Sequence, residues 1–105
     1  MSSSKAAPYS LSPKAVDDLD QVWRYTAETW SIDQADAYID GLVHAFDTIA
    51  AMPNMARERT EFAPPVRIQV HQSHLIIYIF SDGKISVLRI LGARQNWKAI
   101  LNATD

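Results

Sequence analysis

Residues 75–80, Leu-Ile-Ile-Tyr-Ile-Phe, constrain the fold more than any other part of the chain. In a β-strand, successive side chains point to opposite faces of the sheet. The two sets are Leu75, Ile77 and Ile79 on one face, and Ile76, Tyr78 and Phe80 on the other. Both sets are apolar, and a strand that is apolar on both faces needs a cover on each of them. The sequence therefore predicts a central strand between two packed layers.

Two further apolar segments predict the neighbours of this strand in the sheet. Residues 66–70 (VRIQV) precede it, and residues 85–91 (ISVLRIL) follow it. The pair Asp82-Gly83 predicts a tight hairpin turn before the last strand, because glycine accepts the positive φ that such turns demand. Residues 71–74 predict a second, less regular turn.

An edge strand and a helix are predicted at the start of the chain. Residues 8–11 form the edge strand, since Pro8 cannot donate to a sheet ladder. Ser12-Pro13 begins the helix, because serine caps a helix and proline suits its first position. The helix runs to about Trp30, and both of its tryptophans are expected in the core. Its apolar stripe consists of Val16, Leu19, Trp23, Ala27 and Trp30.

A second helix follows with almost no loop. Residues 31–34 match a capping box, in which a serine is followed three residues later by glutamine. Met52-Pro53 ends this helix, because the residue before a proline is pushed out of the helical region. The apolar stripe consists of Ala35, Ile39, Leu42, Val43, Phe46, Ile49 and Ala50. Two helices joined so closely predict an antiparallel helical hairpin.

The predicted order is β-α-α-β-β-β-(α), an α+β fold with the helical hairpin packed on one face of a mainly antiparallel sheet. We expect residues 1–105 to form one domain, with residues 1–7 disordered, residues 54–65 a polar connector and residues 92–105 a C-terminal tail or short helix. The second face of the sheet also needs a cover. Either the terminal helix from Ala93 or another chain supplies it.

Composition excludes several classes of function. The chain has 105 residues and no cysteine, which excludes disulfides and thiolate chemistry, and no run approaches the roughly 20 apolar residues of a membrane helix. The start of the chain is polar, unlike a signal peptide. We therefore expect a cytoplasmic protein that needs no cofactor. Charge is distributed unevenly along the chain. Residues 1–50 hold three basic and eight acidic residues, whereas residues 51–105 hold seven basic and four acidic residues.

Arginines of the basic half are the candidate binding residues. Arg67 and Arg89 lie on predicted strands, where a buried charge is costly unless it is paired. Each could meet an acidic residue of the same chain. Alternatively, both could join Arg57, Arg59 and Arg94 in a basic surface for an acidic partner segment. Trp97, which follows the basic residues, could anchor either the terminal helix or a partner.

Candidates for acid–base chemistry are few. RNA cleavage needs a base, an acid and cations around the phosphate. The available side chains are His71, His74, Glu58, Glu61 and Tyr78. The two histidines lie in a predicted turn, and a zinc site would need distant His44 beside them. We therefore predict no catalytic residue and no metal site.

Two motifs resemble the RelE/ParE superfamily of bacterial toxins, and its ParE branch in particular. The first is PYSLSPKAVDDLDQVWRYTAETW near the start, and the second is LIIYIFSDGKISVLRILGARQNW near the end. The resemblance extends from Tyr9 to Trp97. One departure is Gly92, where many relatives have a histidine, and no tyrosine or histidine follows Tyr78.

The resemblance implies the toxin of a type II toxin–antitoxin system, with a ParD-like antitoxin as partner and DNA gyrase as target. It implies neither sequence-specific nucleic-acid binding nor a membrane. A RelE-like, ribosome-dependent messenger-RNA endonuclease is the alternative, and the missing histidine or tyrosine disfavours it. The residues expected to bind the antitoxin are Arg57, Arg59, Arg67, Tyr78, Arg89, Arg94 and Trp97.

Overall fold

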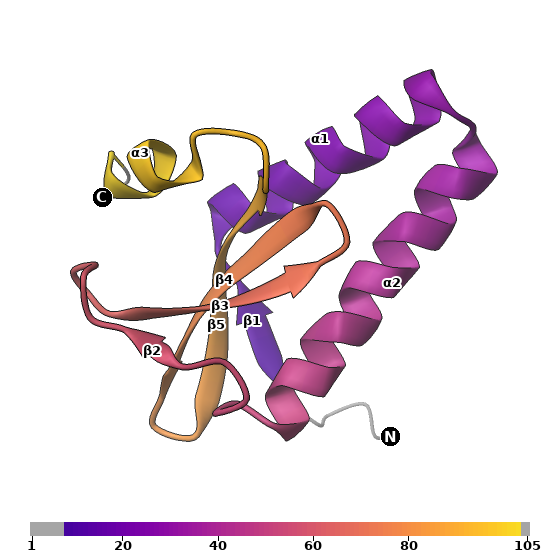
Figure 1. Ribbon diagram of the computed structural model, residues 1–105. Coiled ribbons are helices and arrows are strands. Elements are labelled where there is room, and N and C mark those ends of the chain that lie inside the picture. Colours follow the sequence, from indigo (N-terminus) through magenta and orange to yellow (C-terminus); the bar gives the residue numbers. More distant parts are fainter. Residues whose placement is uncertain (1–7, 104–105) are drawn as a thin grey trace.

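The computed structural model describes residues 8–103 (Figure 1), so the disorder expected for residues 1–7 lies outside the described residues. The elements in chain order are β1 (Tyr9–Leu11), α1 (Pro13–Thr29), α2 (Ile32–Ala51), β2 (Glu58–Arg59), β3 (Val66–His71), β4 (His74–Ser81), β5 (Lys84–Gly92) and α3 (Trp97–Asn102). Within this range, none of the helices is both long enough and apolar enough to cross a membrane.

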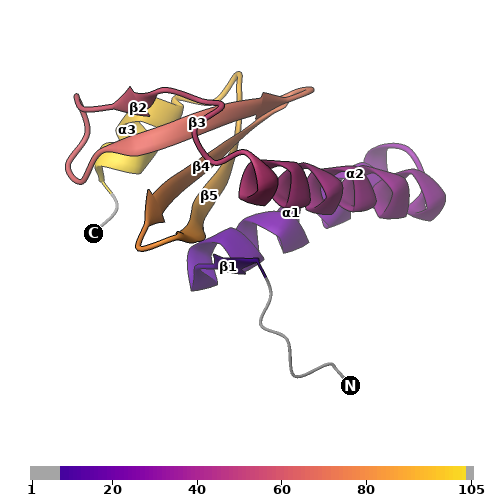
Figure 2. The same ribbon diagram turned by 90° about the horizontal axis from the view of Figure 1, so that it is seen from below.

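The strands form one mixed sheet in the order β1-β5-β4-β3-β2. Strand β1 runs parallel to β5, and the other neighbours are antiparallel. The helices α1 and α2 lie on one face of the sheet, and α3 lies on the other (Figures 1 and 2). This arrangement confirms the predicted α+β fold. Strand β2 was not predicted, because its two residues are too few to show a period within the polar connector.

Strand β4 is the two-faced central strand that the sequence predicts. Residues 75–78 are all buried. One face of the sheet packs under α1 and α2 in a first core cluster that includes Ile76, Tyr78, Leu42, Phe46 and Ile49. The opposite face forms a second core cluster that includes Leu75, Ile77, Phe62, Val66 and Leu91. The alternation along β4 therefore separates two cores.

The chain's own C-terminal helix covers part of the second cluster. Three side chains of α3, Trp97, Ile100 and Leu101, are half-buried against it. This helix begins later than the predicted Ala93, because residues 92–95 form a turn in which Gly92 N–H donates to Gln95 Oε1 at 2.7 Å. Of the two covers considered for this face, the structure shows the terminal helix.

The predicted core stripe of α1 is wrong at both ends. Val16 is 51% exposed and Trp30 is 69% exposed, whereas Ala15, Asp18 and Val22 are buried. The helix is rotated relative to the prediction because the carboxylate of Asp18 points into the protein. Trp30 lies just past the end of α1, at the cap position.

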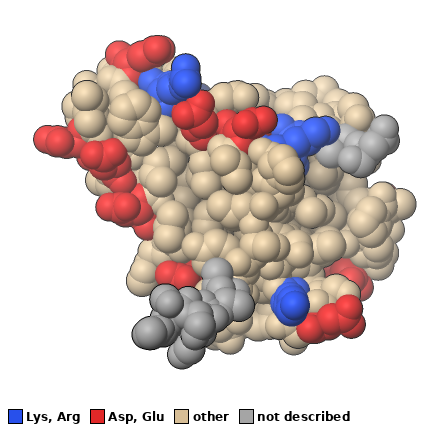
Figure 3. All heavy atoms as spheres, turned by 180° about the vertical axis from the view of Figure 1, so that it is seen from behind, with Lys and Arg blue, Asp and Glu red and all other residues tan. Residues whose placement is uncertain are grey.

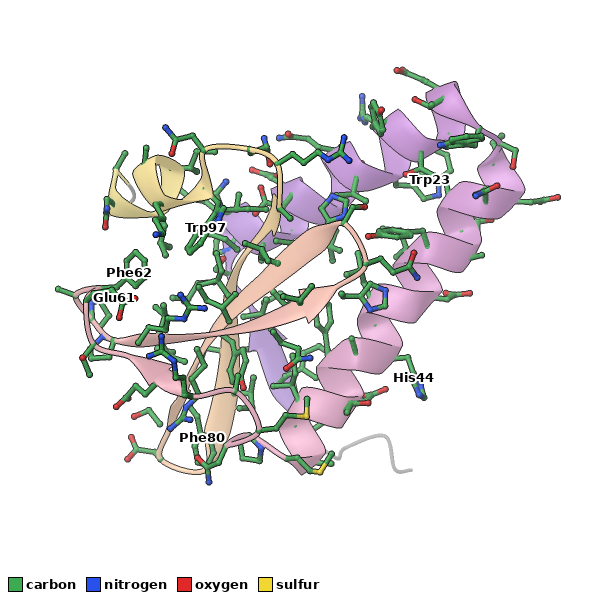
Figure 4. The ribbon with its side chains drawn as sticks, viewed as in Figure 1. Trp23, His44, Glu61, Phe62, Phe80 and Trp97 are labelled. Carbon is green, nitrogen blue, oxygen red and sulfur yellow. The ribbon has the colours of Figure 1, made fainter. Side chains whose placement is uncertain are left out.

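Trp23 is half-buried rather than in the core. Its Nε1 donates to Asp36 Oδ1 at 2.8 Å, so the indole ties α1 to α2 (Figure 4). The stripe of α2 is closer to the prediction, with Ala35, Leu42, Phe46 and Ile49 buried and Val43 exposed.

The predicted start and turn signals are confirmed. Ser12 Oγ accepts from Ala15 N–H at 3.0 Å and donates to the Leu88 carbonyl at 2.6 Å, so the cap of α1 is also a link to β5. Ser31 Oγ accepts from Gln34 N–H at 3.0 Å. Asp82 and Gly83 both have positive φ, of 55° and 75°, as a two-residue hairpin turn of this kind requires.

Candidate functional site

The side chains of Asp18 and Arg89 form an ion pair between α1 and β5. Arg89 Nε lies 2.8 Å from Asp18 Oδ2, and Arg89 Nη2 lies 3.0 Å from Asp18 Oδ1. The backbone N–H of Ile90 donates to the same Oδ2 at 2.9 Å. Only 8% of the Asp18 side chain and 15% of the Arg89 side chain are exposed. The hydrogen bonds to Asp18 raise the pKa of Arg89 above its usual value.

A β-bulge directs Arg89 towards α1. In the β4–β5 register, Tyr78 pairs with Val87 and Ile77 pairs with Arg89, so Leu88 is the extra residue. Bulges change the direction in which a side chain points. Strand β1 pairs with β5 only as far as Val87, so beyond this point α1 takes the place of β1 beside β5, while the other edge of β5 stays paired with β4.

Arg67 and Tyr78 fix the loop that follows α2. Arg67 Nη1 donates to the carbonyl of Ala56 at 2.6 Å, and the Tyr78 hydroxyl donates to the carbonyl of Pro53 at 3.0 Å. Tyr78 is fully buried, and this burial raises the pKa of its hydroxyl. Its side chain is therefore a core element that holds this loop in place.

The remaining predicted binding residues lie at separate places. Arg57 and Arg94 are exposed, in the loop before β2 and in the loop before α3. Arg59 is half-buried, with Nη1 3.8 Å from Glu61 Oε2. The Trp97 ring packs against Phe62, with 6.1 Å between ring centroids (Figure 4).

The predicted residues therefore do not form one arginine-lined surface, and their binding to an antitoxin stays a prediction. Arg89 is paired inside the chain, Arg67 holds a backbone carbonyl, and Tyr78 is buried. The interpretation that strand arginines meet groups of the same chain is confirmed for Arg89. Of the seven predicted residues, only Arg57 and Arg94 are exposed, and they lie on different loops.

Of the candidate acid–base side chains, His71 and His74 lie together across the β3–β4 turn, and the others lie apart from them. The Tyr38 hydroxyl lies 2.7 Å from His74 Nδ1 and faces the turn that also holds His71. Glu58 and Glu61 lie in β2 and the loop after it. His44 points away from α2 on its outer side (Figure 4). Within residues 8–103, no three His, Asp or Glu side chains are placed to hold a metal ion.

A groove of about 710 Å³ lies between the start of α1, the β2–β3 loop and α3. We call it the α1–α3 groove. It is lined by Ser12, Pro13, Lys14, Glu61, Phe62, Ala63, Pro64, Val66, Ile79, Leu88, Arg89, Leu101 and Asn102. Its floor belongs to the second core cluster, which α3 leaves partly uncovered. Lys14 and Glu61 are exposed charges at its rim.

Sequence reasoning did not locate this groove, because its walls come from three segments that are far apart in the chain. The only signal was the shortage of cover on the second face of the sheet. In the structure, the part of this face that stays uncovered lies beside α3. The side chains left there are mainly apolar, so the groove is suited to binding rather than to bond breaking.

Comparison with known proteins gives consistent matches over most of the chain. Residues 9–97 match the family described as "ParE toxin of type II toxin-antitoxin system, parDE". Toxin ParE1 of Mycobacterium tuberculosis is 37% identical over 89 residues, which cover 84% of this chain and 91% of that protein. Toxin ParE1 of Caulobacter vibrioides is 30% identical over 94 residues, which cover 90% of this chain and 97% of that protein.

A solved structure shares the fold. It is titled "Chromosomal ParDE TA system from P. aeruginosa", and it superposes with a TM-score of 0.72 at 18% sequence identity. The similarity covers 82% of this chain and 95% of that one.

We predict that Asp18→Asn lowers the free energy of unfolding by about 3 kcal/mol, because it removes the negative charge that Arg89 contacts in a site largely shielded from water. Urea denaturation measures the change. The matched control is Asp20→Asn, which breaks the exposed Asp20–Arg24 pair (2.9 Å) and should cost less than about 0.5 kcal/mol. Equal losses in the two variants would contradict the structural role of the Asp18–Arg89 pair.

We predict that stability falls as the pH is lowered through the ordinary range of histidine. Burial, together with the nearby His71, lowers the pKa of His74 in the folded protein. The unfolded chain therefore binds more protons at this site between the lowered pKa and about 6.5, so acidification favours unfolding until the pH falls below the lowered pKa. Thermal unfolding across this range should show a shallower dependence of stability on pH for His74→Gln than for the parent, with the exposed His44→Gln as the control substitution.

Proposed function

The chain belongs to the ParE toxin family of type II toxin–antitoxin systems, and on this basis we propose that it inhibits DNA gyrase and is neutralised by tight binding of a ParD-like antitoxin. The observation that carries the proposal is the family match over residues 9–97. The solved ParDE system of similar fold supports an antitoxin partner. We place the action in the cytoplasm, where gyrase works on DNA.

We propose a binding mechanism without bond breaking. A ribonuclease needs an acid, a base and cations around one phosphate. In this chain Tyr78 is buried, His74 faces Tyr38, and Arg89 is held by Asp18. These positions favour inhibition through contact with the target over an RNA-cleaving reaction.

The α1–α3 groove is the proposed seat of the antitoxin arm. Its floor includes Leu88, Ile79 and Phe62, and such a surface suits the apolar face of a segment that folds on binding. Lys14 at the rim matches an acidic arm. Arg57 and Arg94 are exposed and make no ion pair within residues 8–103, so they remain candidates for further contacts with acidic side chains.

Induced expression with growth and plasmid supercoiling followed together tests the function. We expect growth arrest, changed supercoiling, and rescue by the ParD-like antitoxin encoded beside the gene. With purified gyrase, the protein should inhibit supercoiling in proportion to its concentration. Arrest with rapid loss of translation and unchanged supercoiling would instead support the messenger-RNA endonuclease and contradict this proposal.

Charge reversal at the groove rim tests the antitoxin site. We predict that Lys14→Glu weakens antitoxin binding about tenfold, or about 1.4 kcal/mol, because it places a negative charge beside the acidic arm. The control is Lys84→Glu, another charge reversal at an exposed position, in the β4–β5 turn, which should stay within about twofold of the parent. Titration calorimetry measures both affinities, and equal effects would exclude the groove as the seat of the arm.

A further inference from the structure

The free end of the helical hairpin projects past the sheet. The last buried residue of α1 is Val22, and in α2 only Ala35 is buried before Leu42. The turn that joins the two helices lies clear of the strands in both views (Figures 1 and 2). We call residues 28–33 the hairpin tip. Every one of these residues is exposed, so the tip adds little to the core.

Two large apolar side chains stand at the hairpin tip. Trp30 is 69% exposed and Ile32 is 61% exposed. The backbone of Trp30 closes α1 by donating to the Thr26 carbonyl, and an apolar residue here can also staple the start of α2. Neither role needs an indole that is mostly in water. Neighbouring exposed apolar residues mark contact sites, and tryptophan is prominent among residues that dominate binding energy.

The charge around the hairpin tip indicates the kind of partner. Residues 13–51 contain eight acidic and two basic residues. Asp18 and Asp20 are paired with Arg89 and Arg24, whereas Glu28, Asp33 and Asp40 are exposed. Acidic side chains follow the edge of the molecule over α1 and α2 (Figure 3). This surface attracts a basic protein and repels nucleic acid and anionic lipid.

We infer that the hairpin tip is the surface with which this toxin holds its target, and that it docks on a basic, DNA-binding face of that protein. The inference rests on the proposed function, since gyrase handles DNA and DNA-binding surfaces are rich in lysine and arginine. Trp30 and Ile32 enter an apolar recess, and the flanking carboxylates pair with the surrounding cations.

The target and the antitoxin then use different ends of α1. Lys14 of the α1–α3 groove lies in the first turn of this 17-residue helix, and the hairpin tip follows its last turn. At about 1.5 Å per residue the helix is roughly 25 Å long, so a change at one end leaves the side chains at the other end in place.

The test separates gyrase inhibition from antitoxin binding. The apolar variant is Trp30→Ala with Ile32→Ser, and its control is Val70→Ser, which alters a 61% exposed valine on β3. The charge variant is Asp33→Asn with Asp40→Asn, and its control is Asp82→Asn in the exposed β4–β5 turn. Thermal unfolding verifies that each variant is folded, and calorimetry with the antitoxin gives its affinity.

We expect the apolar variant to need at least tenfold more protein for half-inhibition of purified gyrase, with unchanged unfolding temperature and antitoxin affinity. The charge variant should weaken inhibition at low salt more than at high salt. Both controls should inhibit as the parent does. Full inhibition by both tip variants, beside an active parent, would overturn the inference while leaving the proposed function intact. An inactive parent would contradict the proposed function itself.

Three other results would overturn the assignment of the tip to the target. The first is loss of antitoxin affinity in the tip variants, which would make the tip an antitoxin contact. The second is a parent dimer that Trp30→Ala converts to monomer in sedimentation experiments, which would make the occupant a second copy. The third is Trp30-dependent binding to phosphatidylcholine vesicles, which would make it a lipid surface.

Discussion

The contact between Asp18 and Arg89 connects the two halves of the molecule. It joins the first helix to the last strand across 71 residues of sequence. The Asp18 carboxylate also accepts a hydrogen bond from the backbone N–H of Ile90. Because the carboxylate must point inward, it sets which side of α1 faces the sheet, and Ala15 and Val22 become buried on that side. Where β1 ends, α1 continues alongside β5. There the Asp18 carboxylate accepts a backbone N–H of β5 that has no partner strand on that side. The first core cluster and the start of the α1–α3 groove both depend on that placement.

Local patterns were sufficient to predict most of the fold. The alternation from Leu75 to Phe80 gave both faces of β4, because a period of two is imposed by strand geometry itself. The caps at Ser12 and Ser31 and the turn at Asp82-Gly83 were predictable for the same reason. Each depends on the backbone geometry of only a few consecutive residues.

Features that depend on contacts between distant segments were not predictable in the same way. The rotation of α1 follows from the Asp18–Arg89 pair, and the direction of Arg89 follows from the bulge at Leu88. Neither leaves a local pattern, so Val16 and Trp30 were placed in the core although both are exposed. The site residues were predicted least well. Residue types suited to a partner surface were recognised from the sequence, but their separate positions in the fold depend on tertiary structure.

Internal pairing changes what the divided charge of the sequence means. In the sheet half, Asp18 neutralises the charge of Arg89, whereas the guanidinium of Arg67 is directed to a backbone carbonyl and keeps its charge. For the antitoxin site proposed above, the apolar floor of the α1–α3 groove therefore carries more weight than charge. In the helical half, most carboxylates stay exposed, and only Asp18 is taken into the interior. The helical hairpin is thus the surface at which charge can attract a partner over a long range. At the proposed groove site, shape and apolar contact take that role.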